Sequence, residues 1–307
     1  MPRLTPLVLV ILDGFGVSLN TLGNPVAEAK KPVWEDLERN FPFTTLQASG
    51  VAVGLPWGEA GNSEVGHLTM GAGRVLHHHL PRIIHALRDG SFFQNPALLQ
   101  AARHVRRHHS RLHIAGLVSS GSVHSYLDHL FALAEFAVRE ALPDVRLHVF
   151  TDGKDAPPRE AASFLASLAA RLRREAPAVK LATVVGRFFA MDRDEKWDRV
   201  QRTYELLTGG KGEYISSIPQ YLEASYAKGI SDDSIEPAIV MDDPLPVIGE
   251  NDALIFLNFR EDSMRELARA FGEENFDKFP RRPVPNLFVV TMTEYERGMP
   301  GVVPAFP

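Results

Sequence analysis

The sequence predicts an α/β protein in which mostly parallel sheets are covered by helices. Apolar runs of strand length alternate with amphipathic stretches along the chain, and this alternation is typical of parallel βαβ units. The runs are continuously apolar, as expected for strands that are buried on both faces. In chain order, the expected strands are 7–12, 112–118, 145–150, 181–185, 253–259 and 287–292.

Two amphipathic stretches between these runs predict helices, one within 124–142 and one within 157–175. The second begins with Pro157 and Pro158, which suit a first helical turn. The basic stretch 103–113 is interpreted as a solvated helix that runs into a strand. The three histidines at 77–79 have no companion ligands at a recognisable metal-site spacing.

Composition limits the classes of protein that fit. The chain has 307 residues, of which 45% are hydrophobic and 23% charged, values typical of a soluble globular protein with one large or two medium domains. Its net charge of -5 argues against general nucleic-acid affinity. Cysteine is absent, which excludes disulfides, thiolate catalysis and cysteine zinc sites, and fits a cytoplasmic protein.

The N-terminal apolar run does not resemble a targeting or membrane segment. Residues 7–12 end at Asp13 without a small-residue cleavage pattern behind them, and no apolar stretch is long enough to span a bilayer. We therefore expect no signal peptide and no membrane partner. A break between domains is expected near 74–80, where a glycine-rich stretch ends.

Polar side chains follow the expected strands at the points where these end. Asp13 follows the first, 119–124 the second, 152–155 the third, Arg187 the fourth and Arg260 the fifth. In open α/β sheets, ligands bind outside the carboxyl ends of the strands. The sequence therefore predicts a ligand site at this edge.

Ser63 lies in the glycine-rich stretch "GEAGNSEVGHLTMGAG" (58–73). A serine acts as a nucleophile only where a base, a metal ion or backbone donors stabilise its alkoxide. The stretch does not fit the G-x-S-x-G turn of lipases and esterases. The alternative is that Ser63 only caps a helix, with Glu64 in its first turn. These residues alone leave both interpretations open.

Each of the remaining candidate residues, considered alone, fits more than one role. Asp13 suits either a divalent-cation ligand or a turn, and His124 suits either an anion site near a helix start or a structural role. The basic candidates are Lys154, Arg187, Arg193 and Arg260. Arginine at strand ends favours phosphate or carboxylate binding because its planar fork matches these oxyanions, although each alone also fits a surface charge.

Taken together, the motifs resemble one known family. "LVILDGFG", "GEAGNSEVGHLTMGAGR", "GSVHSYLDHL", "TDGKDAPP", "GRFFAMDRDEKWDRV" and "FLNFR" occur in this order and closely resemble cofactor-independent phosphoglycerate mutase, a member of the alkaline phosphatase superfamily. The resemblance runs from residue 7 to about 295, and the serine motif is highly specific.

The resemblance implies an isomerase that interconverts 3-phosphoglycerate and 2-phosphoglycerate in glycolysis through a phosphoserine, with two Mn²⁺ ions. Ser63 corresponds to the phosphorylated serine and Asp13 to a metal ligand, with Ser63 also at the metal. The implied substrate-binding residues are His124, Lys154, Asp155, Arg187, Arg193 and Arg260.

The chain departs from the family pattern at several positions. Ser120 replaces an aspartate and Ser122 a glycine, and Lys154 replaces an arginine and so loses the bidentate fork. Ser263 replaces a second phosphate-gripping arginine, while Arg265 is displaced in sequence. Loss of one charge-assisted contact costs about 1.5–3 kcal/mol, so we expect weaker substrate affinity by tenfold or more.

The resemblance also implies a domain organisation. Residues 1–76 correspond to the opening part of an alkaline-phosphatase-like metal domain, and 77–307 to a complete inserted substrate-binding domain. The family's return segment, which carries a lysine and most metal ligands, is expected to begin about where this sequence ends. The chain alone is therefore expected to be inactive or nearly so, and a separate C-terminal metal-domain chain is a candidate partner.

Two other functions remain as alternatives. One is a non-catalytic module that binds phosphoglycerate or another anion, or one half of a split enzyme. The other is a related metal-dependent phosphatase acting on another substrate, against which Arg187, Arg193 and the "MDRD" motif argue.

Overall fold

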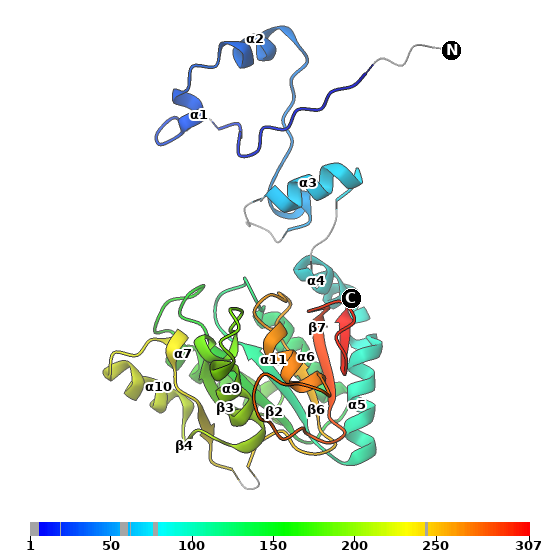
Figure 1. The fold of residues 1–307 in the computed structure, drawn as a ribbon, viewed down its shortest axis with the longest axis vertical. Helices are drawn as coiled ribbons and strands as arrows, with labels where there is room; N and C mark the ends of the chain where they lie inside the picture. The colour runs from blue at the N-terminus through cyan, green and yellow to red at the C-terminus, as the bar shows by residue number, and fades with distance from the viewer. Residues whose placement is uncertain (1–5, 19, 56–60, 62, 76–78, 243–244) are drawn as a thin grey trace. The chain divides into compact units, whose positions relative to one another are not determined.

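A computed structural model describes residues 6–18, 20–55, 61, 63–75, 79–242 and 245–307 (Figure 1). By internal contacts, the chain divides into two compact units, residues 1–81 (unit 1) and 82–307 (unit 2). Helix α4 (His79–Asp89) contains the boundary. The roles assigned above to the two parts of the chain remain predictions.

Unit 2 is built on one eight-stranded sheet, with strand order β4-β5-β3-β2-β1-β6-β7-β8. The strands are β1 Leu112–Leu117, β2 Val145–Thr151, β3 Val179–Gly186, β4 Glu213–Ile215, β5 Ala238–Val240, β6 Ala253–Phe256, β7 Phe288–Thr293 and β8 Val302–Phe306. Every neighbouring pair is parallel except β3 and β5. The predicted α/β class with a mostly parallel sheet is confirmed.

Five of the six expected strands form in unit 2, as β1, β2, β3, β6 and β7. Three strands were missed. β4 and β5 have only three residues each, too few to produce a recognisable apolar run. β8 contains Pro304, which lacks a backbone donor and is tolerated because β8 is an edge strand.

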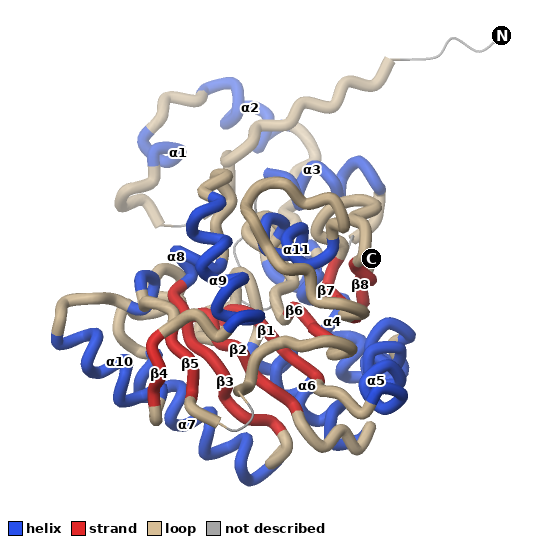
Figure 2. Tube along the Cα trace, turned by 60° about the horizontal axis from the view of Figure 1, so that its bottom comes forward, coloured by secondary structure: helices blue, strands red, loops and turns tan. Residues whose placement is uncertain are grey.

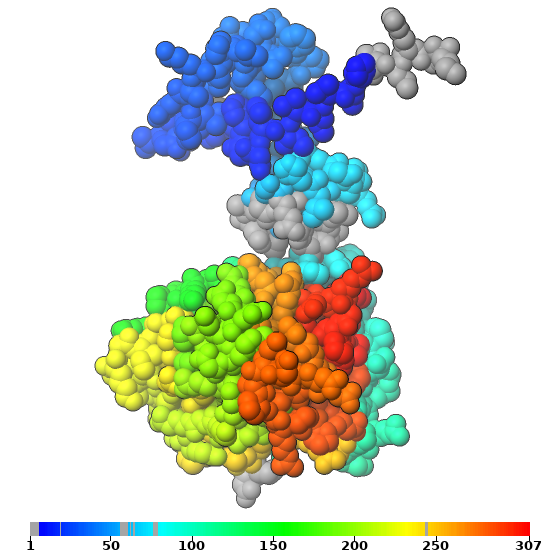
Figure 3. All heavy atoms as spheres, in the orientation of Figure 1, coloured from blue at the N-terminus to red at the C-terminus, as the bar shows by residue number. Residues whose placement is uncertain are grey.

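Helices cover both faces of the sheet. The longer ones are α5 Pro96–His108, α6 Leu127–Arg139, α7 Ala161–Glu175, α9 Trp197–Gly209, α10 Ile218–Ala227 and α11 Arg265–Gly272. Helices α5, α6 and α7 lie on one face and α9 and α11 on the other (Figure 2). The space-filling view shows the green surface of the α9 segment adjoining the orange surface of the α11 segment (Figure 3).

Local signals set the ends of two helices. Asn95 begins α5 by accepting hydrogen bonds from the amides of Ala97 (3.0 Å) and Leu98 (3.3 Å), and its side-chain amide donates to the carbonyl of Ala305 in β8. The prediction that the prolines at 157–158 start a helix is wrong, because α7 begins only at Ala161. The amides of Glu160 and Ala161 donate instead to Asp232 Oδ2, so a residue from a distant segment caps the helix.

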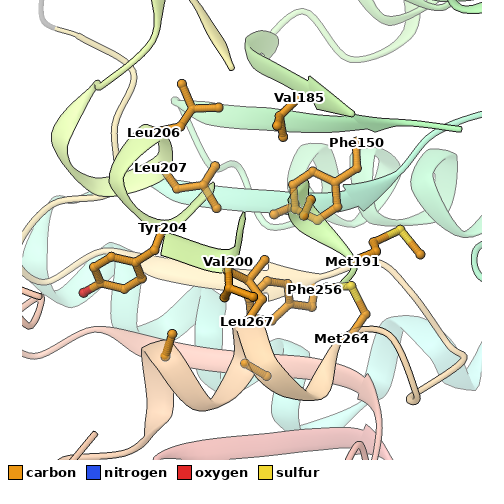
Figure 4. Close-up of a cluster of buried hydrophobic side chains, with 14 of the residues drawn as sticks. Phe150, Val185, Met191, Val200, Tyr204, Leu206, Leu207, Phe256, Met264 and Leu267 are labelled. Atoms are coloured by element: carbon orange, nitrogen blue, oxygen red, sulfur yellow. The ribbon is translucent and has the colours of Figure 1, made fainter. Parts of the chain in front are cut away.

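The core between the sheet and helices α9 and α11 is apolar and well filled (Figure 4). Phe150 and Phe256 project from the sheet, and Leu206, Leu207 and Leu267 project from the helices. All five side chains are at most 1% exposed. Burial of each contributes about 1.5–3 kcal/mol of hydrophobic stabilisation, so this packing holds the strand ends that carry the polar side chains.

A buried polar chain crosses the same sheet. His113 Nε2 lies 3.1 Å from Asp252 Oδ2, His113 Nδ1 lies 2.8 Å from His148 Nε2, and His148 Nδ1 lies 2.9 Å from Thr183 Oγ1. Burial alone would raise the pKa of Asp252, but its interactions with His113 and with the amides of Arg111 and Gly249 together lower the pKa. Because the resulting carboxylate only accepts, each imidazole donates from Nε2 and accepts at Nδ1.

Gly116 in β1 illustrates how closely the strands approach. A methyl group at this position would lie 2.6 Å from Asn258 Oδ1 and 2.7 Å from Leu257 Cβ. We expect Gly116→Ala to lower the free energy of unfolding by about 1–3 kcal/mol through overpacking, measured by urea denaturation. Gly209→Ala is the matched control, because Gly209 lies in α9 with open space around it; an equal loss in both variants would contradict the steric explanation.

Unit 1 contains helices but no strand among its described residues. Its elements are α1 Pro25–Glu28, α2 Pro32–Asn40, the 3₁₀ turn Gly50–Val53 and α3 Ser63–Ala72, followed by α4 at the boundary. A small buried cluster joins Val53, Leu55 and Val65. Among the described residues of the whole chain, no helix is both long and apolar enough to cross a bilayer.

The prediction of a buried strand at 7–12 is wrong. This segment has no regular secondary structure, and its side chains are exposed, with Leu7 at 94% and Val10 at 72%. A strand requires a neighbour to pair its backbone groups and a layer to cover its side chains. The described part of unit 1 supplies neither.

Candidate anion-binding site

An open cavity of about 360 Å³ lies where strands β1, β2, β3 and β6 end. Its walls consist of basic side chains, carboxylates and a few apolar side chains. The cavity is lined by all six residues predicted to bind substrate, His124, Lys154, Asp155, Arg187, Arg193 and Arg260, together with Val123, Phe188, Met191, Asp192, Asp194, Arg199 and Ser263. The structure thus brings together residues that are up to 136 positions apart, from His124 to Arg260.

Arg187, the first residue of the short helix α8 (Arg187–Ala190), connects three of the cavity's loops. Its Nη1 donates to Asp152 Oδ1 and Asp155 Oδ2, each at 2.6 Å, and its Nη2 donates to His124 Nε2 at 2.9 Å. Burial alone would lower the pKa of Arg187, but the bonds to Asp155 and Asp152 outweigh it and raise the pKa. This charge is therefore permanent.

Asp152 holds the loop after β2 in place through hydrogen bonds. Its carboxylate accepts from Ser119 Oγ at 2.8 Å and from the amides of Lys154 and Asp155. Burial alone would raise the pKa of Asp152, but these donors and Arg187 lower it below the ordinary value. The ionised side chain consequently fixes the loop that presents Lys154 and Asp155.

His124 is buried (4% exposed) at the start of the loop that leads into α6. Burial, followed by the charges of Arg187 and Arg260, lowers its pKa to about 4, so the imidazole is neutral at pH 7. Its carbonyl accepts from the amides of Phe259 and Arg260, and these bonds join the β1 and β6 loops.

Asp262 pairs two of the cavity's arginines through a single oxygen. Oδ2 accepts from Arg193 Nη1 at 2.7 Å and from Arg260 Nη2 at 2.9 Å. Burial alone would raise the pKa of Asp262, but Arg260 and then the other donors lower it. Each guanidinium uses only one of its five N–H groups in this contact, so most donors remain available to an anion.

The family departures have distinct structural consequences. Lys154 is exposed at the cavity, and its Nζ has no partner in the described part of the chain. Ser263 is buried and contacts His124. Arg265 does not line the cavity, because its Nε donates to the carbonyl of Tyr295; it does not replace the missing arginine. Ser120 bonds to Glu160 through its amide and its hydroxyl.

Several cavity residues were not singled out from the sequence. Arg199 donates to Asp192 at 2.8 Å and stacks over the ring of Phe188 at 3.8 Å, so it borders the cavity with its charge already paired. Asp152 and Asp262, which bind the cavity's arginines without lining it, were given no individual role. Asp152 directly follows β2 and Asp262 lies in the loop after β6, but sequence does not reveal which carboxylate an arginine will meet.

Ser63 and Asp13 lie together within unit 1 although 50 positions separate them. Ser63 is the first residue of α3, and its Oγ donates to Asp13 Oδ2 at 2.7 Å. The Oγ also lies 3.4 Å from His67 Nδ1. Asn62 and His77–His78 fall outside the described residues.

These two oxygens fit part of a divalent-cation site. Hydroxyl and carboxylate oxygens are suitable ligands for hard cations, but a metal ion requires at least four ligands. Among the described residues, no group of three or more acidic or histidine side chains is arranged to hold a metal. Asp13 and Ser63 would supply two ligands of such a site, and the described residues place no group of three or more acidic or histidine side chains there to complete it.

Comparison with known proteins agrees with the motifs. The family model described as "BPG-independent PGAM N-terminus" matches residues 83–297, which is most of the chain. The chain belongs to this family. Among similar curated proteins, the 2,3-bisphosphoglycerate-independent phosphoglycerate mutase of Moorella thermoacetica is 46% identical over 306 residues, and that of Chloroflexus aggregans is 44% identical over 331.

Solved structures show the same relationship for this member of the BPG-independent mutase family. A crystal structure of Leishmania mexicana phosphoglycerate mutase, obtained at low cobalt concentration, superposes with a TM-score of 0.74 at 31% identity and covers 93% of this chain. This chain covers 54% of that structure, 59% of the Moorella protein and 61% of the Chloroflexus protein. It thus spans about three fifths of the length of the curated relatives.

Proposed function

We propose that this chain is the substrate-binding part of a phosphoglycerate mutase that interconverts 3-phosphoglycerate and 2-phosphoglycerate in the cytoplasm. The observation that carries this proposal is the cavity in which Arg187, Arg193, Arg260, Lys154 and His124 converge. Clustered guanidinium and ammonium groups suit the phosphate and carboxylate of such a substrate. The family membership supports the same substrate class.

Ser63 is the nucleophile of the proposed reaction. In the proposed reaction its Oγ accepts the phosphoryl group from one hydroxyl of the substrate and returns it to the neighbouring hydroxyl. Divalent ions such as Mn²⁺, when bound, supply positive charge that favours the ionised serine. Asp13, at 2.7 Å from Oγ, would hold such an ion together with Ser63, while the cavity residues keep the glycerate in place between the two transfers.

Further chain is needed to complete the metal domain. The exposed apolar side chains of 7–12 and the two-ligand set of Asp13 and Ser63 support this requirement, since large exposed apolar surfaces usually mark contacts with other protein. We therefore propose a C-terminal metal-domain segment as partner. An anion-binding module without catalysis remains the second candidate, because the cavity in unit 2 is formed without that segment.

A reconstitution experiment tests the proposal. The 307-residue chain with Mn²⁺ is expected to bind 3-phosphoglycerate in calorimetry yet produce no 2-phosphoglycerate. Addition of the C-terminal two fifths of the Moorella relative, expressed separately, is expected to restore turnover. Ser63→Ala should abolish the restored activity, whereas the control Ser49→Ala should retain it.

Three other results of the reconstitution experiment would contradict parts of this proposal. Robust turnover by the chain alone would show that no further segment is required. Binding without turnover in every combination would favour the non-catalytic module. Absence of phosphoglycerate binding would refute the proposed substrate class.

A further inference from the structure

Ser263 occupies a position at which the family motif has an arginine. Its side chain is only 3% exposed, yet it lines the cavity. Its Oγ lies 3.1 Å from His124 Nδ1. A residue that departs from the family pattern therefore touches His124, the one histidine among the described residues that line the cavity.

The direction of this hydrogen bond follows from the opposite side of the ring. Arg187 Nη2 lies 2.9 Å from His124 Nε2, and a guanidinium has donors but no acceptor. Nε2 must therefore present its lone pair, so the proton of the neutral ring is on Nδ1. Ser263 Oγ is then the acceptor of that proton.

No other described group competes well for the Nδ1 proton. The carboxylate of Asp262 on the β6 loop lies 3.8 Å from Nδ1. On the other side of the ring, the carboxylate of Asp155 lies 3.6 Å from Nε2, so it does not hold a proton on that nitrogen. Both distances exceed that of a hydrogen bond. As an acceptor, Ser263 still has its own O–H to donate, and in the described part of the chain this hydrogen has no other partner.

We propose that Ser263 is a positioning residue for His124, which accepts the Nδ1 proton, fixes the ring with Nε2 toward Arg187, and keeps its own O–H for an anion in the cavity. An arginine at 263 offers only donors and would oppose the Nδ1–H group. In place of one charged contact from an arginine, this site then has two hydrogen bonds in sequence: His124 Nδ1–H donates to Ser263 Oγ, and the Ser263 O–H donates to the anion. The part of the inference that concerns the anion rests on the proposed function.

Nuclear magnetic resonance of the ¹⁵N-histidine-labelled chain at pH 7 tests the tautomer directly. The parent is expected to show a protonated Nδ1 and an unprotonated Nε2 for His124. Ser263→Ala should broaden or lose the Nδ1 proton signal through solvent exchange and admit the other tautomer. Ser263→Thr keeps the hydroxyl and should preserve the parent spectrum.

Ser125→Ala is the matched control, because Ser125 is equally buried and adjacent to His124 but donates to the carbonyl of Leu117. It should leave the His124 signals unchanged. By calorimetry, Ser263→Ala is expected to bind 3-phosphoglycerate about tenfold more weakly than the parent, the effect of one lost hydrogen bond, and Ser263→Thr nearly as well as the parent.

The inference is overturned if the parent ring carries its proton on Nε2, or if Ser263→Ala leaves the Nδ1 proton signal unchanged. The parent spectrum alone decides the tautomer, so an unfolded variant does not leave the question open. If the parent shows the expected tautomer but no phosphoglycerate binding, the proposed function fails while the positioning role of Ser263 stands.

Discussion

Replacing Arg187 with alanine is expected to lower the free energy of unfolding by about 3–5 kcal/mol and to abolish phosphoglycerate binding. The Arg187 side chain is 11% exposed, and its partner Asp152 is 1% exposed. Removal of the guanidinium leaves that buried carboxylate without its counter-charge and releases His124 Nε2. Urea denaturation measures the first effect and calorimetry the second.

Two further variants separate stability from binding. Arg187→Lys keeps the charge but loses the planar fork and should be intermediate in both measurements. Arg193→Ala removes a side chain that is 56% exposed in its pair with Asp262, so stability should change by no more than about 1 kcal/mol while binding weakens. An Arg187→Ala variant as stable as the parent would contradict the assigned role of its ion pairs.

Acidification from pH 6.5 to 5.5 is expected to destabilise unit 2 by about 3 kcal/mol, about 1 kcal/mol for each of three buried histidines whose pKa lies far below 6.5, His124, His129 and His148. Burial lowers the pKa of His113 and His148, that of His124 to about 4 and that of His129 to about 3. The unfolded chain binds protons near pH 6.5, but the folded chain does not. The stability is therefore present above pH 6.5 and is lost as the pH falls.

His129 provides the test of this explanation. Both of its ring nitrogens lack a hydrogen-bond partner among the described residues. His129→Leu should reduce the loss between pH 6.5 and 5.5 by about 1 kcal/mol, as measured by urea denaturation at each pH. His85→Leu, whose side chain is 80% exposed in the parent, should leave the pH dependence unchanged; a similar reduction in both variants would contradict the role of burial.

The sequence alone was sufficient for the α/β class and for most of the candidate site. Continuous apolar runs identified β1, β2, β3, β6 and β7, because strands buried on both faces have no polar side to interrupt the pattern. Parallel strands end at the same edge. Residues that follow different strands, such as His124 and Arg260, were therefore expected to meet, and the cavity contains them.

The same reasoning failed where a segment depends on its neighbours. Residues 7–12 read as a buried strand, but they have no strand to pair with in the described unit 1 and are exposed. In β4 and β5 the opposite occurs, because three residues carry too weak a pattern and pairing across the sheet makes them strands.

Tertiary structure alone decided the pairing and protonation of the polar groups. Sequence singled out Ser63, Asp13 and the arginines as candidates, but it did not reveal that Ser63 donates to Asp13 or that Asp262 joins Arg193 and Arg260. Residue order determines the side-chain types and the edge of the sheet at which they emerge. Hydrogen-bond partners and pKa values depend on distances of a few ångströms and on burial, which are set only when the chain has folded.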